Sequence, residues 1–399
     1  MRSPGRAQTL STLIVGGGIG GLSLARELVL RGLPVTVLER APKLGAVGAG
    51  IIMNPNAMAV LEGNGLAGCV RVESCPYLAR DTFDHRGRWL ATRDYRPLYA
   101  AGRLAVGALV HRMQLHQCLH DGLPAGTLRL DACVRELHAG PDGVRVETEG
   151  GETLGADVLV GADGIRSSVR ARFFGAGEPV YLGYRSHRFV VPNRDGLEHF
   201  TEFLGRGKRI GLVPIGGGQL YVWTTFNSPR ESRAWGLEGV EALRQLFAEF
   251  TDARVRRVFA EVASVERVLC TDIEEVHPAG WVDGRVVLLG DAAHALTPNM
   301  GQGAGMAMED AAVLAEELAL ADRGAKGLAT ALQRYVARRR ARVETIVRLS
   351  RVVGEEGQRT GALGCWLRNR RMRREGRVVE RAQAALERLL AWPVEGEDR

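Results

Sequence analysis

Three glycine-containing segments hold residues whose types and spacing could do chemistry, and the first is Gly16-x-Gly18-x-x-Gly21. It follows a β-prone run at 9–15 and opens an apolar pattern with helical spacing. This context predicts that Gly16 makes a tight turn, that Gly18 lets a pyrophosphate approach the backbone, and that Gly21 lets helix and strand pack closely. Glu39 ends the next predicted strand, where its carboxylate could bind a ribose. The segment alone predicts a dinucleotide site.

A second segment runs from Asp157 to Arg170 and passes through Gly-Ala-Asp163-Gly164. The Asp-Gly pair is typical of a turn, and the serines that follow could cap a helix. By its residues alone, this segment predicts only a corner between a strand and a helix.

The third segment begins at Gly290-Asp291 and continues to Glu309-Asp310. A predicted buried strand delivers Asp291 to its carboxyl end, where the side chain could bind the ribityl hydroxyls of a flavin. Glycines 301, 303 and 305 expose N–H groups where the next helix begins, and this positive end could stabilise charge on a reduced flavin. His294 is interpreted as a structural hydrogen-bonding residue.

These segments need elements that bring them together. Residues 9–39 predict a βαβ unit, 108–120 a strand entering a helix, and 143–148 with 153–160 a hairpin. Between 180 and 268 the pattern changes to strands with Gly-rich turns, such as 209–214 and 219–226, interrupted by helical stretches such as 240–250. A strand at 285–289 and helices at 304–320, 332–353 and 378–390 complete the pattern.

We therefore predict an α/β fold with a discontinuous Rossmann-like domain, an inserted β-sheet substrate domain and C-terminal helices. The nucleotide domain is assigned to 1–70, 106–178 and 276–350. The substrate domain is assigned to 71–105 and 179–275, and the helical region to 351–399.

The composition of the 399-residue chain excludes few functions. It contains no apolar run of 18 residues and no signal peptide, so we expect a cytoplasmic protein. Its net charge is +7, and nearly all of its basic residues are Arg. The arginines are densest at 338–342 and 368–374. Neither stretch is interleaved with aromatic residues, so a solvated helix face is expected and nucleic acid is not. The six cysteines lack metal-site spacing, and most are expected to be buried thiols.

In their order and spacing, the three segments resemble the class A flavoprotein monooxygenases, the family of para-hydroxybenzoate hydroxylase. The resemblance covers roughly residues 10–350. Residues 48–51 with Asn54-Pro55-Asn56 resemble the segment beside the flavin, and Arg112 resembles the family's FAD-contacting Arg. Residues 305–311 are more similar to the salicylate hydroxylase, zeaxanthin epoxidase and urate hydroxylase branch.

The resemblance implies noncovalent FAD, with NAD(P)H and O2 as co-substrates. It also implies hydroxylation of an aromatic or heteroaromatic small molecule through a flavin C4a-hydroperoxide. The implied FAD-binding residues are Gly16, Gly18, Ile19, Gly20, Gly21, Glu39, Arg40, Gly50, Ile51, Arg112, Val134, Asp163, Asp291, Pro298, Gly301, Gln302, Gly303 and Ala304.

Fewer residues can be assigned to the substrate. Arg209 and Tyr221 match positions used by urate hydroxylases, so Tyr221 could bind or deprotonate a phenolic group and Arg209 could hold an anion. Pro298 could shape the oxygen pocket or simply enter a helix. Arg185, His187 and Arg188 are further candidates.

Several alternatives stay open. Epoxidation of a lipophilic ring or alkene, as in secondary metabolism, and urate-hydroxylase-like activity are alternatives within the family. A flavin reductase or oxidase and a non-catalytic flavin-binding protein are alternatives outside it. A halogenase is disfavoured, because no Trp-x-Trp-x-Ile-Pro stretch occurs and lysine is almost absent. A monomer or homodimer is expected, and the helix at 373–392 could contact a membrane weakly.

Overall fold

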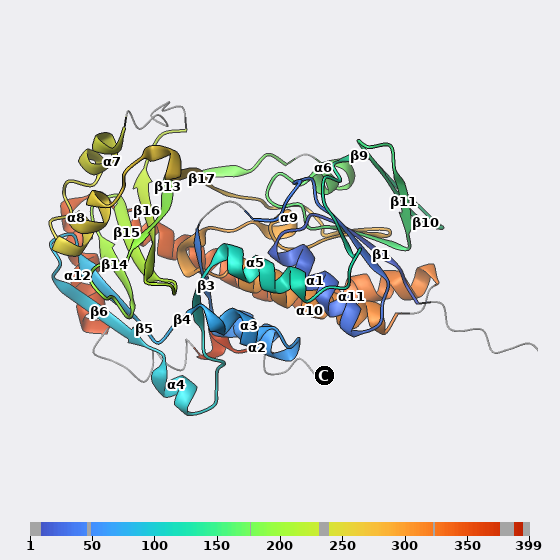
Figure 1. Ribbon diagram of the computed structural model, residues 1–399, viewed down its shortest axis with the longest axis horizontal. Coiled ribbons are helices and arrows are strands. Elements are labelled where there is room, and N and C mark those ends of the chain that lie inside the picture. Colours follow the sequence, from blue (N-terminus) through green and yellow to red (C-terminus); the bar gives the residue numbers. More distant parts are fainter. Residues whose placement is uncertain are drawn as a thin grey trace, which may run out of the picture.

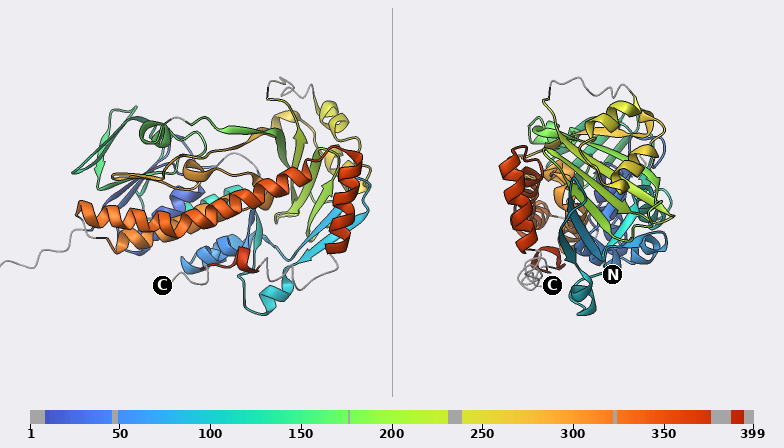
Figure 2. Two further views of the ribbon diagram at one scale, coloured as in Figure 1. Left: turned by 180° about the vertical axis from the view of Figure 1, so that it is seen from behind. Right: turned by 90° about the vertical axis from the view of Figure 1, so that its left-hand side faces the viewer.

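The computed structural model describes residues 9–45, 49–175, 177–230, 239–321, 324–375 and 387–393. Two large sheets lie side by side along the longest axis, and the long helix α11 (Ala325–Gly357) runs behind both (Figures 1 and 2). Both sheets are part of a mixed α/β architecture, as the sequence predicts.

The first sheet is the Rossmann-like part, with strand order β18-β19-β12-β1-β2-β8. Its strands are parallel except β18, and they are β1 (Thr12–Val15), β2 (Val35–Leu38), β8 (Leu128–Arg129), β12 (Val158–Gly161), β18 (Val282–Asp283) and β19 (Val286–Leu288). Helices α1 (Ile19–Leu30), α10 (Gly303–Ala319) and α11 cover one face. The central strands are buried along their whole length, as expected of a parallel sheet covered on both faces.

A small antiparallel sheet of β9 (Val134–Gly140), β10 (Gly143–Thr148) and β11 (Thr153–Ala156) covers the other face. The predicted hairpin was therefore only partly right. Residues 153–156 pair with β10, but the chain then leaves this sheet and β12 joins the parallel one. The apolar pattern of the sequence continues without a break from 153 to 160, because β11 and β12 both turn apolar side chains toward the same core.

The second large sheet has the order β17-β13-β16-β15-β14-β5-β6, antiparallel except where β14 meets β5. Its strands are β5 (Ala79–Asp84), β6 (Trp89–Asp94), β13 (Val180–Pro192), β14 (Phe200–Leu204), β15 (Lys208–Pro214), β16 (Gln219–Asn227) and β17 (Leu269–Glu275). Helices α7 (Val240–Leu246) and α8 (Ala253–Ala260) pack on one face, over a core that includes Phe189, Phe203 and Phe247.

A third group of elements lies beneath the two sheets. It contains the sheet β3-β7-β4, formed by β3 (Gly50–Met53), β4 (Cys75–Pro76) and β7 (Ala108–His111). Its helices are α2 (Pro55–Gly63), α3 (Ala67–Val72), α4 (Arg96–Ala100) and α5 (Arg112–Asp121). A disulfide between Cys69 and Cys118 joins α3 to α5. The expectation of mostly buried thiols was wrong, since of the four free cysteines only Cys365 is buried.

The remaining helices are α6 (Ser168–Phe173), α9 (Asp291–His294), α12 (Ala362–Glu375) and two short 3-10 turns, η1 (Val265–Arg267) and η2 (Pro298–Met300). The predicted helix at 378–390 falls largely outside the described residues. Within the described residues, none of the helices has the length and apolarity needed to span a membrane.

Candidate active site

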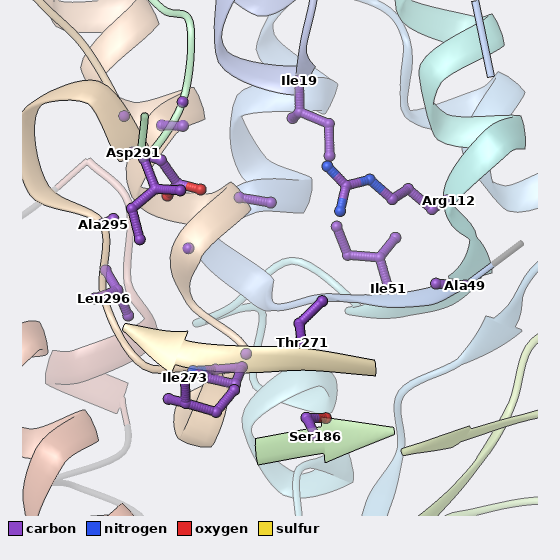
Figure 3. A pocket seen from close by; sticks show the side chains of 18 of the residues that line it. Ile19, Ala49, Ile51, Arg112, Ser186, Thr271, Ile273, Asp291, Ala295 and Leu296 are labelled. Carbon is purple, nitrogen blue, oxygen red and sulfur yellow. The ribbon is translucent and has the colours of Figure 1, made fainter. Parts of the chain in front are cut away.

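A cavity of about 770 Å³ lies between the Rossmann-like sheet and the seven-stranded sheet (Figure 3). On the Rossmann side it is lined by the glycine loop, β3, the start of α5, the 162–166 corner and the segment 289–307. On the other side it is lined by alternate residues of β13 and β16, by Arg209 of β15 and by consecutive residues of β17. The predicted residues that line it are Gly18, Ile19, Gly20, Gly50, Ile51, Arg112, Arg209, Tyr221, Asp291, Pro298, Gly301, Gly303 and Ala304.

The glycine loop has the geometry that its spacing predicts. Gly16 has φ +110°, and a Cβ there would lie 2.3 Å from the carbonyl oxygen of Ala162. A Cβ on Gly21 would lie 2.0 Å from the carbonyl oxygen of Gly16. A Cβ on Gly18 would meet nothing within 4 Å, so the backbone is open to the cavity just where helix α1 begins. This arrangement suits a pyrophosphate at a helix N-terminus.

Two charged side chains reach the cavity from opposite walls. Arg112, the first residue of α5, extends between Ile19 and Ile51, and Asp291 starts α9 across from it (Figure 3). Neither side chain has a hydrogen-bond or ion-pair partner among the described residues. The same space is therefore faced by a carboxylate and by a cation. The carboxylate suits ribityl hydroxyls, and the cation suits an electron-rich ring edge or a phosphate, as FAD requires.

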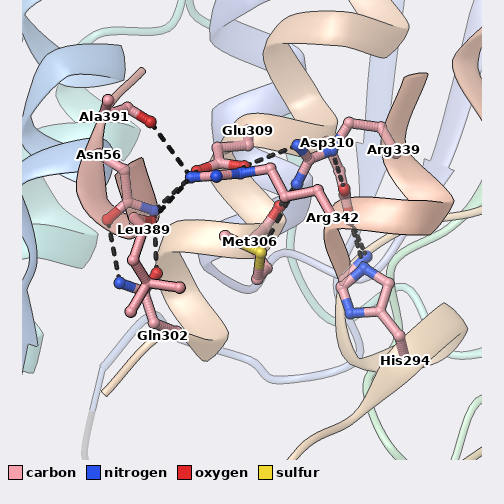
Figure 4. A network of polar contacts seen from close by, with 11 residues as sticks. Asn56, His294, Gln302, Met306, Glu309, Asp310, Arg339, Arg342, Leu389 and Ala391 are labelled. Atoms are coloured by element: carbon pink, nitrogen blue, oxygen red, sulfur yellow. Dashed lines mark hydrogen bonds and ion pairs between the residues drawn. The ribbon is translucent and has the colours of Figure 1, made fainter. Parts of the chain in front are cut away.

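A buried ionic network holds the backbone next to Asp291 on the side away from the cavity (Figure 4). The Gly290 N–H donates to Oδ2 of Asp310 at 3.1 Å, and Nε2 of His294 lies 2.5 Å from the same oxygen. Burial opposes ionisation of Asp310, but His294 and Arg339 lower its pKa to about 2. His294 therefore has the structural role that the sequence predicts, and it does not line the cavity.

The same network corrects the expectation of a solvated helix face at 338–342. Arg339 is fully buried and donates to Glu309 at 2.6 Å and to Asp310 at 2.7 Å. Arg342 donates to Glu309 and to the carbonyl oxygens of Leu389 and Ala391. A basic run of this kind is indistinguishable in sequence from an exposed one, because the acids that pair with it lie about 30 residues away.

The loop from Pro298 to Ala304 presents its backbone to the cavity. Gly301 adopts a left-handed φ of +64° and Gly303 begins α10. Gln302, between them, turns away and is fully buried, where its side chain exchanges hydrogen bonds with Asn56. Asn56 in turn donates to Glu309. If Gln302 contacts a cofactor, only its backbone can do so in this conformation.

Several predicted residues stand outside the cavity lining. The Glu39 carboxylate accepts from the N–H groups of Gly17 and Ala41 at 2.7 and 2.9 Å. Asp163 caps α6 by accepting from Ser168 and Val169. Val134 packs against the hydrophobic core of the Rossmann-like part. Arg40 is exposed after β2. Their assignment to FAD stays a prediction.

On the substrate side, Arg209 is not the free cation that the sequence suggests. Its Nε and Nη2 donate to Oε1 of Glu202 at 3.0 and 2.7 Å, and its Nη1 donates to Asn299 at 2.6 Å. Burial opposes ionisation of Glu202, yet Arg80 and Arg209 lower its pKa to about 2. Arg209 is therefore held within the wall by Glu202, which it shares with Arg80, and by Asn299, and its guanidinium also lies over Trp223.

The other candidates divide between the two faces of the sheet. Tyr221 and Arg188 line the cavity, and Arg188 has no hydrogen-bond or ion-pair partner among the described residues. Burial raises the pKa of Tyr221, while Arg188 and Arg112 oppose the rise, so the phenol stays neutral. Arg185 and His187 do not line the cavity. Arg185 is paired with Asp272, and His187 stacks on Phe226 in the core.

The sequence did not reveal Glu202, Asn299 or Trp223 as parts of this wall. Trp223 lies over Gly211, where a Cβ would come within 2.1 Å of its ring. The alternation of Tyr221, Trp223 and Thr225 along β16 could have indicated one shared face. The partner of Arg209 could not, because it depends on which strand pairs with β15.

Known proteins are similar to this chain in sequence and in fold. The family model described as "FAD binding domain" matches residues 9–350. The chain is 38% identical over 372 residues to aurachin C monooxygenase/isomerase of Stigmatella aurantiaca, covering 91% of this chain and 94% of that relative. It is 35% identical over 366 residues to 2-heptyl-3-hydroxy-4(1H)-quinolone synthase of Pseudomonas aeruginosa, with coverages of 90% and 93%.

Among solved structures, HpxO of Klebsiella pneumoniae complexed with FAD and uric acid has a TM-score of 0.84. It is 26% identical and covers 95% of this chain and 96% of that one. The predicted resemblance is confirmed, and the residues facing the cavity suit the cofactor of these relatives. The chain belongs to the class A FAD-binding monooxygenases, and it is an FAD- and NAD(P)H-dependent monooxygenase.

Proposed function

We propose that the enzyme hydroxylates a lipophilic N-heteroaromatic ring that carries an oxygen but no carboxylate, of the 2-alkyl-4-quinolone type. The observation that carries this proposal is the pairing of Arg209 with Glu202. A buried Arg whose Nε, Nη1 and Nη2 already donate to a carboxylate and an amide offers little to a benzoate-type anion.

The rest of the wall supports the same substrate class. Ile52, Trp223, Ile273 and Leu296 give the cavity apolar and aromatic surface suited to a fused ring with an alkyl chain. Two of the relatives most similar in sequence are named for aurachin C and for a heptyl hydroxyquinolone.

When bound, FAD takes a hydride from NAD(P)H and delivers one oxygen atom of O2, while the other oxygen leaves as water. The chain supplies orientation. The neutral phenol of Tyr221 would donate to the ring oxygen, and the Arg188 guanidinium would stabilise negative charge on it as the ring reacts with the electrophilic oxygen. Pro298, at the start of η2, would shape the space beside the reacting carbon.

A substrate panel tests this proposal. Purified enzyme is mixed with a 2-alkyl-4-quinolone, 3-hydroxybenzoate or uric acid, and NAD(P)H-dependent flavin reduction is followed by absorbance. Only the quinolone should accelerate reduction, by about tenfold or more, and yield a product heavier by one oxygen. Because an epoxide has the same mass gain, NMR of the product decides between hydroxylation and the alternative of epoxidation. Coupled turnover of 3-hydroxybenzoate in preference to the quinolone would overturn the proposal.

Tyr221→Phe and Arg188→Met test the two orienting groups. Each should lower kcat/KM for the quinolone by about tenfold, the cost of one hydrogen bond to a charged or developing charged group. Arg256→Met is the control, since Arg256 is exposed on α8, outside the cavity lining, and it should leave kcat/KM unchanged. Equal losses in all three variants would assign the effect to the fold rather than to the substrate contacts.

A further inference from the structure

Exposed apolar side chains are concentrated in one stretch of the chain. Of the twelve exposed large apolar residues that the described structure contains, five lie between positions 349 and 367. They are Leu349, Val352, Leu363, Trp366 and Leu367. The first two belong to the end of α11 and the other three to α12, and both helices lie on the same outer side of the molecule (Figure 2). We call these five residues the apolar patch.

The three patch residues of α12 share one stripe with its basic residues. Leu363, Trp366 and Leu367 are 69%, 53% and 52% exposed, at the i, i+3, i+4 spacing of one helix face. Arg370, Arg371 and Arg374 continue the same stripe by one and two further turns. The opposite side of the helix is anchored, since Arg368 is buried and donates to the carbonyl oxygen of Gly205, and Cys365 is buried. The helix therefore presents a fixed apolar and cationic face.

Positive charge is concentrated around the patch. Residues 348–374 contain eight arginines, two glutamates and no other charged residue. Arg368 is buried, and Arg351 and Arg373 pair with Glu275 and Asp84 of other elements, which leaves five exposed arginines against the two glutamates. Both glutamates lie near the end of α11, and Glu356 is already paired with Arg359. Leu363, Trp366 and Leu367 thus adjoin a strongly cationic surface.

From these observations we infer that α12 and the end of α11 dock on an anionic lipid bilayer. Exposed Trp and Leu side chains enter the boundary between headgroups and acyl chains, and arginines beside them bind lipid phosphates. A second copy of the chain fits less well. A symmetric contact through this face would bring the two sets of arginines together, and like charges oppose such an interface. Docking would also place the enzyme where an alkyl-substituted substrate partitions, but the inference does not depend on that substrate.

The experiment uses the full-length holoenzyme and vesicles without substrate. Binding is measured by co-sedimentation with vesicles of phosphatidylcholine alone and of phosphatidylcholine mixed equally with phosphatidylglycerol. We expect binding to the anionic vesicles at least about tenfold stronger than to the neutral ones, decreasing as salt is raised. Equal binding to both vesicle types, or none to either, would overturn the inference.

Two variants locate the surface. Leu363→Ser combined with Trp366→Ser and Leu367→Ser should reduce binding to anionic vesicles by about tenfold or more. Arg370→Glu combined with Arg374→Glu should reduce binding to anionic vesicles by at least about fivefold for each residue replaced. The control is Leu320→Ser combined with Val72→Ser, which removes apolar side chains that are 70% and 81% exposed from other surfaces and should leave binding unchanged.

Flavin absorbance and thermal melting establish that each variant is folded. If the control lost binding as strongly as the patch variants, the surface assigned here would be wrong. It would also be wrong if the patch variants changed the sedimentation coefficient of the free protein and left vesicle binding intact, because the face would then join two copies. None of these outcomes affects the substrate panel, so failure of this inference is distinguishable from failure of the proposed function.

Discussion

Nη2 of Arg209 donates a 2.7 Å hydrogen bond to Oε1 of Glu202, and both side chains are 2% exposed. Arg209→Ala removes one of the two cations that stabilise a buried carboxylate, so we expect the free energy of unfolding to fall by about 3 kcal/mol. Urea unfolding measures this. Arg340→Ala, which breaks the exposed pair with Glu344, is the control and should cost less than about 0.5 kcal/mol. Similar small losses in both would show that the Arg209 pair is not a buried one in solution.

Gly18 and Gly21 should separate cofactor binding from folding. Gly18→Val places a side chain in open space toward the cavity, so the apoprotein should keep its melting temperature while FAD binding is lost. Gly21→Val forces a clash with the Gly16 carbonyl and should destabilise the fold itself, by about 3 kcal/mol or more. Flavin absorbance and thermal melting of the apoproteins report the two effects. Tight FAD binding by Gly18→Val would refute the pyrophosphate position.

Asp291 should contribute to FAD affinity through its charge. Because its carboxylate faces the cavity with no partner among the described residues, Asp291→Ala should weaken FAD binding about 10- to 100-fold, the effect of losing a charge-assisted hydrogen bond. Fluorescence titration of apoprotein with FAD measures the dissociation constant. Asp283→Ala, at the sheet edge away from the cavity, is the control and should bind FAD like the parent. An unchanged dissociation constant for Asp291→Ala would remove this residue from the cofactor site.

His187 should affect stability in a defined pH range. Burial, assisted by Arg185, lowers its pKa to about 4, so the folded protein keeps it neutral while the unfolded chain binds a proton below about pH 6.5. The contribution of His187 to the free energy of unfolding is therefore fully present above about pH 6.5, and it decreases as the pH drops toward 4. His187→Phe should remove part of the decline in stability between about pH 7.5 and about pH 5.

Urea unfolding at both pH values compares this variant with His138→Phe, an exposed substitution on β9 that should leave the decline unchanged. Because His187 lies in the core and not in the cavity lining, His187→Phe should also keep bound FAD. A decline identical to that of the parent would show that His187 is protonated in the folded protein.

The features predictable from sequence are those set by a few neighbouring residues. The roles of Gly16 and Gly21 follow from backbone contacts within one turn and the strand beside it, and Asp291 follows from the strand that delivers it. Side-chain direction inside a predicted loop was not predictable. Gln302 stands between two cavity glycines yet faces Asn56, because the partner that satisfies its amide comes from a segment 246 residues away.

The substrate wall shows the same limit. The alternation along β13 and β16 predicts two faces, but the sequence does not say that Arg188 faces the cavity and His187 the core. That choice depends on which face α7 and α8 cover, and it is settled only when the whole sheet assembles.

The strand order of the Rossmann-like sheet has a consequence for synthesis of the chain. β1 pairs with β2 and with β12, and β12 pairs with β19 (Val286–Leu288), so the sheet acquires β19 only after nearly three quarters of the chain has been made. Segments from residue 18 to residue 307 line one cavity. A nascent chain therefore cannot present a complete flavin pocket on the ribosome until α10 has emerged. Flavin capture should accordingly be a late event that marks completion of both sheets, and the N-terminal βαβ unit must wait without its ligand for most of translation.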